Sequence, residues 1–215
     1  MSMALGILGG MFDPVHNGHM AMARVAIDVL GLDQVRMIPC GIPPHREPAR
    51  CTAQQRVDML TLACRNDEGI VVDEREIDRP GKSFAFDTLT GVRNEFKNEK
   101  LYYLLGADAL LSLPEWYRWH DLFDLCHIVA FQRPGFSLKE SNTLQEEIQH
   151  RLTDLPGQLQ TADYGLVLIC NSFSIDVSSS QVRQRIEAQL PLDGMVDPVV
   201  IDYICERGLF SMSTK

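Results

Sequence analysis

Short apolar runs alternate with segments of helical periodicity along almost the whole chain, and this alternation limits the possible folds more than any other feature. The runs predicted to be strands cover residues 3–8, 34–40, 70–76, 101–106, 127–135 and 165–170. The predicted helices cover residues 18–30, 52–64, 84–96, 138–153 and 179–189, and a last helix starts at Pro198. Strand–helix–strand units favour parallel strands joined by right-handed crossovers. The sequence therefore predicts an α/β fold, a doubly wound parallel sheet with helices on both faces.

The size and charge of the chain restrict the classes of function. Its 215 residues suit one domain over residues 1–215, with a helical C-terminal portion from about residue 179. The formal net charge is −9. An acidic balance argues against a nucleic-acid or an anionic-membrane partner. Anionic small molecules remain compatible, because a few basic side chains can converge in one cleft.

Six cysteines are spread over predicted strands, helices and a loop, and no two of them form a C-x-x-C pair. Reduced thiols are the preferred interpretation, with disulfides or a zinc site as the alternative. The N-terminus lacks a basic-plus-apolar signal, and no apolar run reaches the ~18 residues of a membrane span. We therefore expect a cytoplasmic protein.

The stretch Gly9–His19 follows the first predicted strand and contains the strongest chemical signal. Glycines let the backbone approach a phosphate closely, and the following helix start favours an anion. His16 and His19 are three residues apart, so both imidazoles can share one face of that helix start. The stretch predicts an anion-binding cradle; the alternative is a tight turn with a capping histidine. It is not a dinucleotide G-x-G-x-x-G loop, and Glu76 stands where a P-loop ending at residues 81–83 would need glycine.

The segment GGMFDPVHNGH closely resembles the signature of the nucleotidyltransferase superfamily with an H-x-G-H motif. Within it, the chain resembles the bacterial nicotinate-nucleotide adenylyltransferases. The motifs that carry this resemblance follow in the family's order at residues 38–46, 82–89, 104–119, 131–135 and 177–186. The resemblance implies a Rossmann-like fold and transfer of AMP from ATP to nicotinate mononucleotide. Pyrophosphate and nicotinate adenine dinucleotide would be the products, in NAD biosynthesis.

The implied reaction needs positioning and charge stabilisation more than covalent chemistry. The 5′-phosphate of the acceptor is already a nucleophile, so it would attack the ATP α-phosphate in line, without a covalent intermediate. The expected cofactor is Mg²⁺, held through the ATP phosphates and not by protein ligands. The resemblance assigns His16, His19 and Arg183 as catalytic residues.

The residues expected to bind ATP lie at the predicted strand ends and helix starts. They are Gly9, Gly10, Met11, Phe12, His16, His19, Gly106, Asp108, Arg133, Ser178, Ser179 and Arg183. Two groups of them have structural alternatives: Asp108 could cap a helix, and the serines could form an ordinary helix N-cap.

The residues expected to bind nicotinate mononucleotide are Cys40, His45, Arg46, Phe84, Ala85, Phe86 and Trp116. By the resemblance, Trp116 would stack on the pyridinium ring through a cation–π contact; core packing is its alternative. Backbone N–H groups at the predicted helix start near Phe84 and Ala85 would favour a carboxylate over a carboxamide. The chain departs from the family's usual residues at Met11, Ala85 and Cys40.

Other functions remain as alternatives. The acceptor could be nicotinamide mononucleotide or a phosphopantetheine-like phosphate, or the protein could bind nucleotides as a regulator without turnover. Class I aminoacyl-tRNA synthetases share an H-x-G-H signature, but this chain is too short and too acidic, and it lacks a K-M-S-K-S-like stretch. The loop around His45 and the stretch after Arg133 are candidates for closing over substrate. The expected oligomeric state is open, a monomer or a small homo-oligomer.

Overall fold

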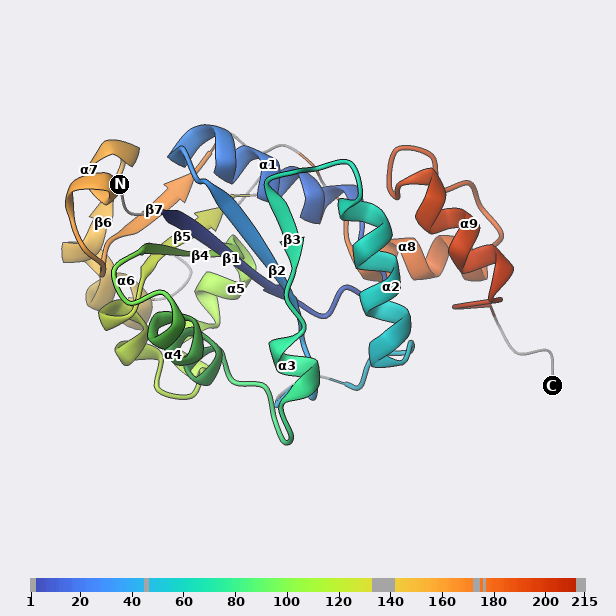
Figure 1. The fold of residues 1–215 in the computed structure, drawn as a ribbon, viewed down its shortest axis with the longest axis horizontal. Coiled ribbons are helices and arrows are strands. Elements are labelled where there is room, and N and C mark those ends of the chain that lie inside the picture. Colours follow the sequence, from blue (N-terminus) through green and yellow to red (C-terminus); the bar gives the residue numbers. More distant parts are fainter. Residues whose placement is uncertain (1–2, 45–46, 133–141, 172–174, 176, 212–215) are drawn as a thin grey trace.

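The computed structural model describes residues 3–44, 47–132, 142–171, 175 and 177–211. Within these ranges seven parallel strands form one sheet in the order β3-β2-β1-β4-β5-β7-β6 (Figure 1). The strands are β1 (Ala4–Gly10), β2 (Gln34–Pro39), β3 (Ile70–Val72), β4 (Lys100–Gly106), β5 (His127–Phe131), β6 (Leu152–Thr153) and β7 (Val167–Cys170). The predicted parallel α/β sheet is confirmed.

Helices cover both faces of this sheet. The α-helices are α1 (Asn17–Leu30), α2 (Ala53–Cys64), α3 (Arg75–Asp78), α4 (Ala85–Glu95), α5 (Ala107–Leu111), α6 (Asn142–Ile148), α7 (Pro156–Thr161), α8 (Ser179–Glu187) and α9 (Pro198–Glu206). The 3₁₀ helices of the described ranges are η1 (Leu113–Glu115), η2 (Trp119–Asp124) and η4 (Gln149–Arg151). Helices α1, α2, α7, α8 and α9 share one apolar cluster, and α4, α5 and α6 share another. In the described ranges, no helix combines the length and apolarity needed to cross a bilayer.

Strand β4 shows why the sheet separates two cores. Tyr102 and Leu104 belong to the cluster under α1 and α2, whereas Leu101, Tyr103 and Leu105 belong to the cluster under α4 and α5. All five side chains are buried. Because successive residues of a strand point to opposite faces, a continuous apolar run produces a strand that is buried on both sides.

The third strand is shorter than predicted. The sequence suggested a strand over residues 70–76, but β3 ends at Val72 and α3 follows. The Asp73 carboxylate is buried and accepts hydrogen bonds from Arg36 Nε at 2.8 Å and from Arg75 Nε at 2.8 Å. Burial alone would raise the pKa of Asp73, but these two guanidinium groups outweigh it and hold the pKa below its ordinary value. The backbone N–H of Asp73 still donates to the Met37 carbonyl of β2 at 2.9 Å, and the charged network lies where the chain passes from β3 into α3.

The segment predicted as one helix over residues 138–153 is also divided. Within its described part, α6 ends at Ile148, η4 follows, and β6 pairs in parallel with β7. The apolar residues explain the division, because Leu144 and Ile148 are buried on α6, while Thr153 is buried on a strand. Helix α7, which the sequence analysis did not predict, starts with Pro156 at its first position.

The sheet reverses its winding at β1. Strand β1 lies between β2 and β4, and the helices α1 and α4 lie on opposite sides of the sheet (Figure 1). The carboxyl ends of β1 and β4 therefore form a topological switch point, where doubly wound sheets bind their ligands. Residues Gly10 and Gly106 end these two strands.

Candidate active site

A tight turn connects β1 to α1. A side chain on Gly10 would place its Cβ 2.9 Å from the Phe12 ring, so only glycine fits there. Phe12 is buried and has a left-handed backbone, with φ at +49°. Such a conformation is costly for a bulky residue and persists only when its surroundings hold it. Neighbouring segments of the chain must therefore hold this turn in place.

Two stacked imidazoles mark the start of α1. The ring centroids of His16 and His19 are 3.6 Å apart with an interplanar angle of 22°. The backbone N–H of His16 donates to Nδ1 of His19 at 3.3 Å, which places the ring proton of a neutral His19 on Nε2. Phe12 contacts the His19 ring edge-on, with centroids 4.9 Å apart. The prediction that both histidines share one face is confirmed.

Asp13 joins this turn to the segment before α2. Its buried carboxylate accepts hydrogen bonds from the backbone N–H of Arg50 at 2.7 Å and of Cys51 at 3.1 Å. The sequence analysis quoted Asp13 within the motif but gave it no role. A carboxylate inside an otherwise apolar stretch was the available signal, since buried carboxylates need hydrogen-bond donors.

Helix α8 is attached to the same turn by two of the predicted site residues. Ser179 Oγ donates to the carbonyl of Pro14 at 2.9 Å, and Arg183 Nη1 donates to the carbonyl of Asp13 at 2.6 Å. Ser178 caps α8 and forms a capping box with Gln181. The sequence alternative of a serine N-cap is therefore confirmed for Ser178. Both Ser179 and Arg183 lie against the turn that carries the histidines.

A second part of the C-terminal region covers the first turn of α1. The backbone N–H of Asn17 donates to the carbonyl of Met195 at 2.8 Å, and its side-chain amide donates to the carbonyl of Gly194 at 3.0 Å. The sequence analysis did not single out Asn17. Its partners are far away in the sequence, so local pattern gave no signal for this contact.

At the end of β4, Gly106 occupies the N-cap position of α5 with an extended backbone. Asp108 lies in the first turn of α5 and is exposed. The alternative that Asp108 caps this helix is thus wrong, because the N-cap position belongs to Gly106. An acidic side chain in a first helical turn is favoured by the helix dipole, and here it remains open to solvent beside the switch point.

The segment after β2 joins the histidine turn to the start of α4. The backbone N–H of Cys40 donates to the carbonyl of Gly10 at 2.8 Å, and that of Gly41 donates to Ser83 Oγ at 3.1 Å. Burial, with Glu76 nearby, raises the pKa of the Cys40 thiol to about 11. Cys40 therefore stays protonated near neutral pH and is unsuited to nucleophilic attack.

The expected acceptor residues of α4 and the following aromatic segment lie close together. Phe84 is the N-cap of α4 and its side chain makes no cap hydrogen bond, so within the described residues the first-turn N–H groups of Ala85 and Phe86 have no side-chain cap. The ring centroids of Phe84 and Tyr117 are 4.9 Å apart. Trp116 is half-buried and meets Tyr103 edge-on at 6.2 Å, so it packs in part against the core, and its contact with a pyridinium ring stays a prediction.

Three predicted site residues, His45, Arg46 and Arg133, lie outside the described residues. The other predicted residues fall into two groups at the carboxyl end of the sheet, one around the β1–α1 turn and one around the start of α4. Of the two candidate loops for substrate closure, the stretch after Arg133 falls on residues outside the described ranges, and the loop around His45 is described except for residues 45 and 46.

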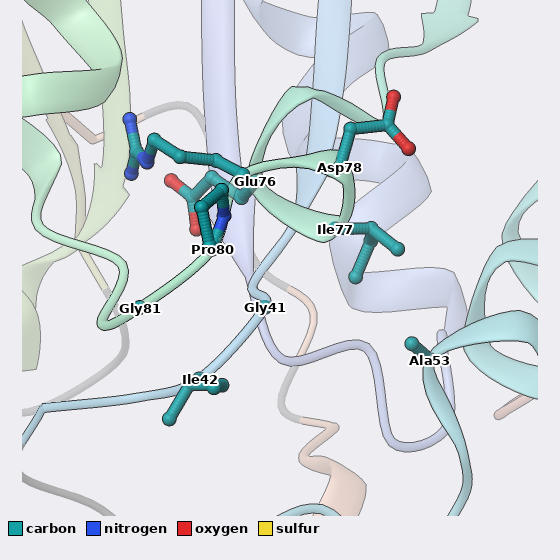
Figure 2. A pocket seen from close by; sticks show the side chains of 9 residues that line it. Gly41, Ile42, Ala53, Glu76, Ile77, Asp78, Pro80 and Gly81 are labelled. Carbon is teal, nitrogen blue, oxygen red and sulfur yellow. The ribbon is translucent and has the colours of Figure 1, made fainter.

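A separate pocket of about 330 Å³ lies beside the segment after β2 (Figure 2). Its lining residues are Gly41, Ile42, Ala53, Glu76, Ile77, Asp78, Arg79, Pro80 and Gly81. In Figure 2 the Asp78 carboxylate points away from the other side chains of the lining. The buried Glu76 carboxylate accepts a hydrogen bond from Thr88 Oγ1 at 2.6 Å. None of the predicted site residues lines this pocket.

The described residues contain no group of three or more histidine, cysteine or acidic side chains that could hold a metal ion. All six cysteines are free thiols.

The chain matches the family described as cytidylyltransferase-like over residues 7–185. That match runs from the middle of β1 to near the end of α8. It therefore includes the histidine turn and the residues of α8 that bond to it. The chain belongs to this family, a class that fits a glycine turn and paired imidazoles at the switch point of a parallel sheet.

Individual relatives are more specific. A probable nicotinate-nucleotide adenylyltransferase of Aeromonas hydrophila is 36% identical over 206 residues, covering 96% of both chains. Another, from Stenotrophomonas maltophilia, is 40% identical over 214 residues with the same coverage. The solved Plasmodium falciparum nicotinic acid mononucleotide adenylyltransferase, complexed with NaAD, superposes with a TM-score of 0.73 at 16% identity and 97% coverage of both chains, which shows a shared fold. Within the cytidylyltransferase-like family, the chain groups with the nicotinate-nucleotide adenylyltransferases.

Proposed function

We propose that this protein transfers AMP from ATP to nicotinate mononucleotide, producing nicotinate adenine dinucleotide and pyrophosphate in NAD biosynthesis. The observation that carries the proposal is the stacked pair His16 and His19 behind a glycine turn at the switch point of the sheet. The names of the relatives, at 36% and 40% identity, support the same reaction and the same acceptor.

The chemistry follows from where charge develops. The acceptor 5′-phosphate attacks the ATP α-phosphate in line, and negative charge accumulates on the departing pyrophosphate. The Nε2–H of His19 and the ring of His16 stabilise that charge, and one such donor contributes typically about 2.7–4 kcal/mol. No general base is required. The thiols nearest the turn, Cys40 and Cys51, support direct transfer, because burial raises their pKa values to about 11 and about 12.

The ATP side of the site comprises the glycine turn, the end of β4 and the start of α8. Gly106 and Asp108 border the nucleotide, and Arg133 contacts its phosphates. Ser178, Ser179 and Arg183 complete the site from α8, where the hydrogen bond of Arg183 to Asp13 also fixes the turn. Magnesium enters as part of the substrate, MgATP, and neutralises the phosphates.

The acceptor side comprises the segment after β2 and the start of α4. The first-turn N–H groups of α4 bind the nicotinate carboxylate, and Trp116 contacts the pyridinium ring. Cys40, His45 and Arg46 border the acceptor phosphate. A helix start without a side-chain cap in the described part of the chain supports this assignment. We place the reaction in the cytoplasm, in line with six free thiols.

The test is pyrophosphate release from MgATP with nicotinate mononucleotide and with nicotinamide mononucleotide in parallel. A strong preference for the acid is expected. Equal use of both acceptors, or preference for the amide, would support adenylyl transfer but contradict nicotinate mononucleotide as the preferred acceptor. Release with neither acceptor, despite ATP binding, would instead favour a nucleotide-binding regulator.

A further inference from the structure

Arg56 on α2 is a fully buried arginine, with 2% of its surface exposed. Its Nη1 donates to the backbone carbonyl of Met11 at 2.9 Å. Its Nε is buried and has no hydrogen-bond partner within the described part of the chain. No acidic side chain of that part forms an ion pair with it. The sequence analysis did not single out this residue.

The nearest carboxylates are engaged elsewhere. Asp13 and Glu76 influence Arg56 through their charge, but Asp13 accepts from two backbone N–H groups and Glu76 accepts from Thr88. Burial therefore lowers the pKa of the Arg56 guanidinium. A buried charge without a partner destabilises a fold, and an apolar side chain of similar volume usually fills such a space better. Packing alone does not account for an arginine here.

The one hydrogen bond of Arg56 falls at a sensitive point of the turn. The Met11 carbonyl belongs to the peptide group that enters Phe12, the residue with φ at +49°. Phe12 in turn packs edge-on against the His19 ring, with centroids 4.9 Å apart. Contacts therefore run without a gap from the guanidinium through the Met11 carbonyl and the Phe12 ring to His19.

We infer that Arg56 is a positioning residue for the adenylyl-transfer site: its hydrogen bond to the Met11 carbonyl fixes the left-handed turn and thereby the orientation of the His19 ring. The inference rests on the proposed function only for its kinetic consequence. Arg56 contacts neither substrate in this account. It acts through the backbone of the turn.

The kinetic test compares Arg56→Lys and Arg56→Met with the wild type. Misplacing a catalytic group by about 1 Å can reduce the rate about 100-fold, so Arg56→Met should lose on the order of that factor in kcat. KM for both substrates should change less than threefold. Arg56→Lys can donate one hydrogen bond, so its kcat should fall less. It also provides a second variant if Arg56→Met does not fold.

Arg93→Met is the matched control. Arg93 donates to the backbone carbonyls of Leu125 and Glu99, and burial lowers its pKa too, but it lies before β4 and β5, at the opposite end of the sheet. It should lose thermal stability and retain kcat. Arg56 variants with kcat within twofold of the wild type, or with kcat reduced no more than in Arg93→Met, would overturn the inference.

A spectroscopic measurement separates this inference from the proposed function. The ¹⁵N shifts of the imidazoles report the tautomer of His19, which the wild type holds with Nδ1 as an acceptor. In folded Arg56→Met and Arg93→Met proteins, only the Arg56 variant should shift these signals, and Arg56→Lys should shift them less. That result would support the inference even if the wild type showed no turnover, and unchanged His19 signals would reject it even if turnover were confirmed.

Discussion

The His16 ring occupies the space that a side chain on Gly18 would need. A Cβ on Gly18 would lie 2.9 Å from His16 Nδ1 and 3.0 Å from its Cε1. The carbonyl of Val177 closes the same space at 3.3 Å. The glycine of the H-x-G-H motif is thus needed for the imidazole beside it, not for a special backbone angle.

Gly18→Ala should therefore fold and lose activity. The helix propensity of alanine offsets part of the cost of the steric clash, so thermal stability should change little. The displaced His16 ring should reduce turnover by about 10- to 100-fold. Gly157→Ala, at a helix position where a Cβ meets nothing within 4 Å, is the control. Normal turnover in Gly18→Ala would show that His16 need not stay where it lies.

His19→Ala should lower turnover by about 100- to 1,000-fold while the fold survives, because it removes a donor to the leaving pyrophosphate. His19→Gln should retain more turnover, since its amide nitrogen reaches the place of Nε2. Steady-state pyrophosphate release measures both variants, with His150→Ala, an exposed histidine, as control. A near-normal rate for His19→Ala would eliminate its proposed role.

Ala85→Pro removes one N–H from the first turn of α4 without disturbing the helix. Proline is favoured at this position, and Phe84 before it already has the extended backbone, with φ −104° and ψ 135°, that a following proline requires. The preference for nicotinate over nicotinamide mononucleotide should fall by about tenfold or more, the worth of a hydrogen bond to a charged group. Competition between the two acceptors measures it.

The control for that variant is Ala53→Pro, at the first position of α2, where Thr52 is likewise extended. Its acceptor preference should match the wild type. An unchanged preference in Ala85→Pro would exclude the N–H of Ala85 as a carboxylate donor.

The Asp73 network should make stability depend on pH in the acid range. The hydrogen bonds from Arg75 and Arg36 hold the pKa of Asp73 below its unfolded value, so the network stabilises the fold above that value and is lost as the pH falls. The stability difference between the wild type and Asp73→Asn should be largest near pH 7 and shrink below about pH 5. Urea unfolding at several pH values measures it, with exposed Asp28→Asn as control; a difference that stays constant down to pH 3 would contradict this account.

Sequence reasoning succeeded where the determinants are local. The pair His16 and His19 is set by helical spacing, and the Ser178 cap by the residue three positions on. The parallel sheet follows from alternating apolar periods. In contrast, the end of β3 was not predicted, and the charged network there joins Asp73 to Arg36, 37 residues away.

The contacts that hold the histidine turn could not be predicted in the same way. Asn17 and Arg183 bond to carbonyls 177 and 170 positions away in the sequence, and no local pattern encodes such partners. Arg56 did leave a signal, because it lies four residues before Leu60 on the buried stripe of α2. A charged residue on an apolar helical stripe indicates a buried polar role.

The hydrogen bonds from Asn17 to the C-terminal region also concern how the protein is made. A ribosome adds roughly 5–20 residues per second, so the 177 positions between Asn17 and Gly194 take roughly 10 to 35 s to synthesise. Throughout that interval the histidine motif has been synthesised but lacks the carbonyls that cover its helix start. The histidine turn, encoded among the first residues, is therefore among the last parts of the nascent chain to be completed.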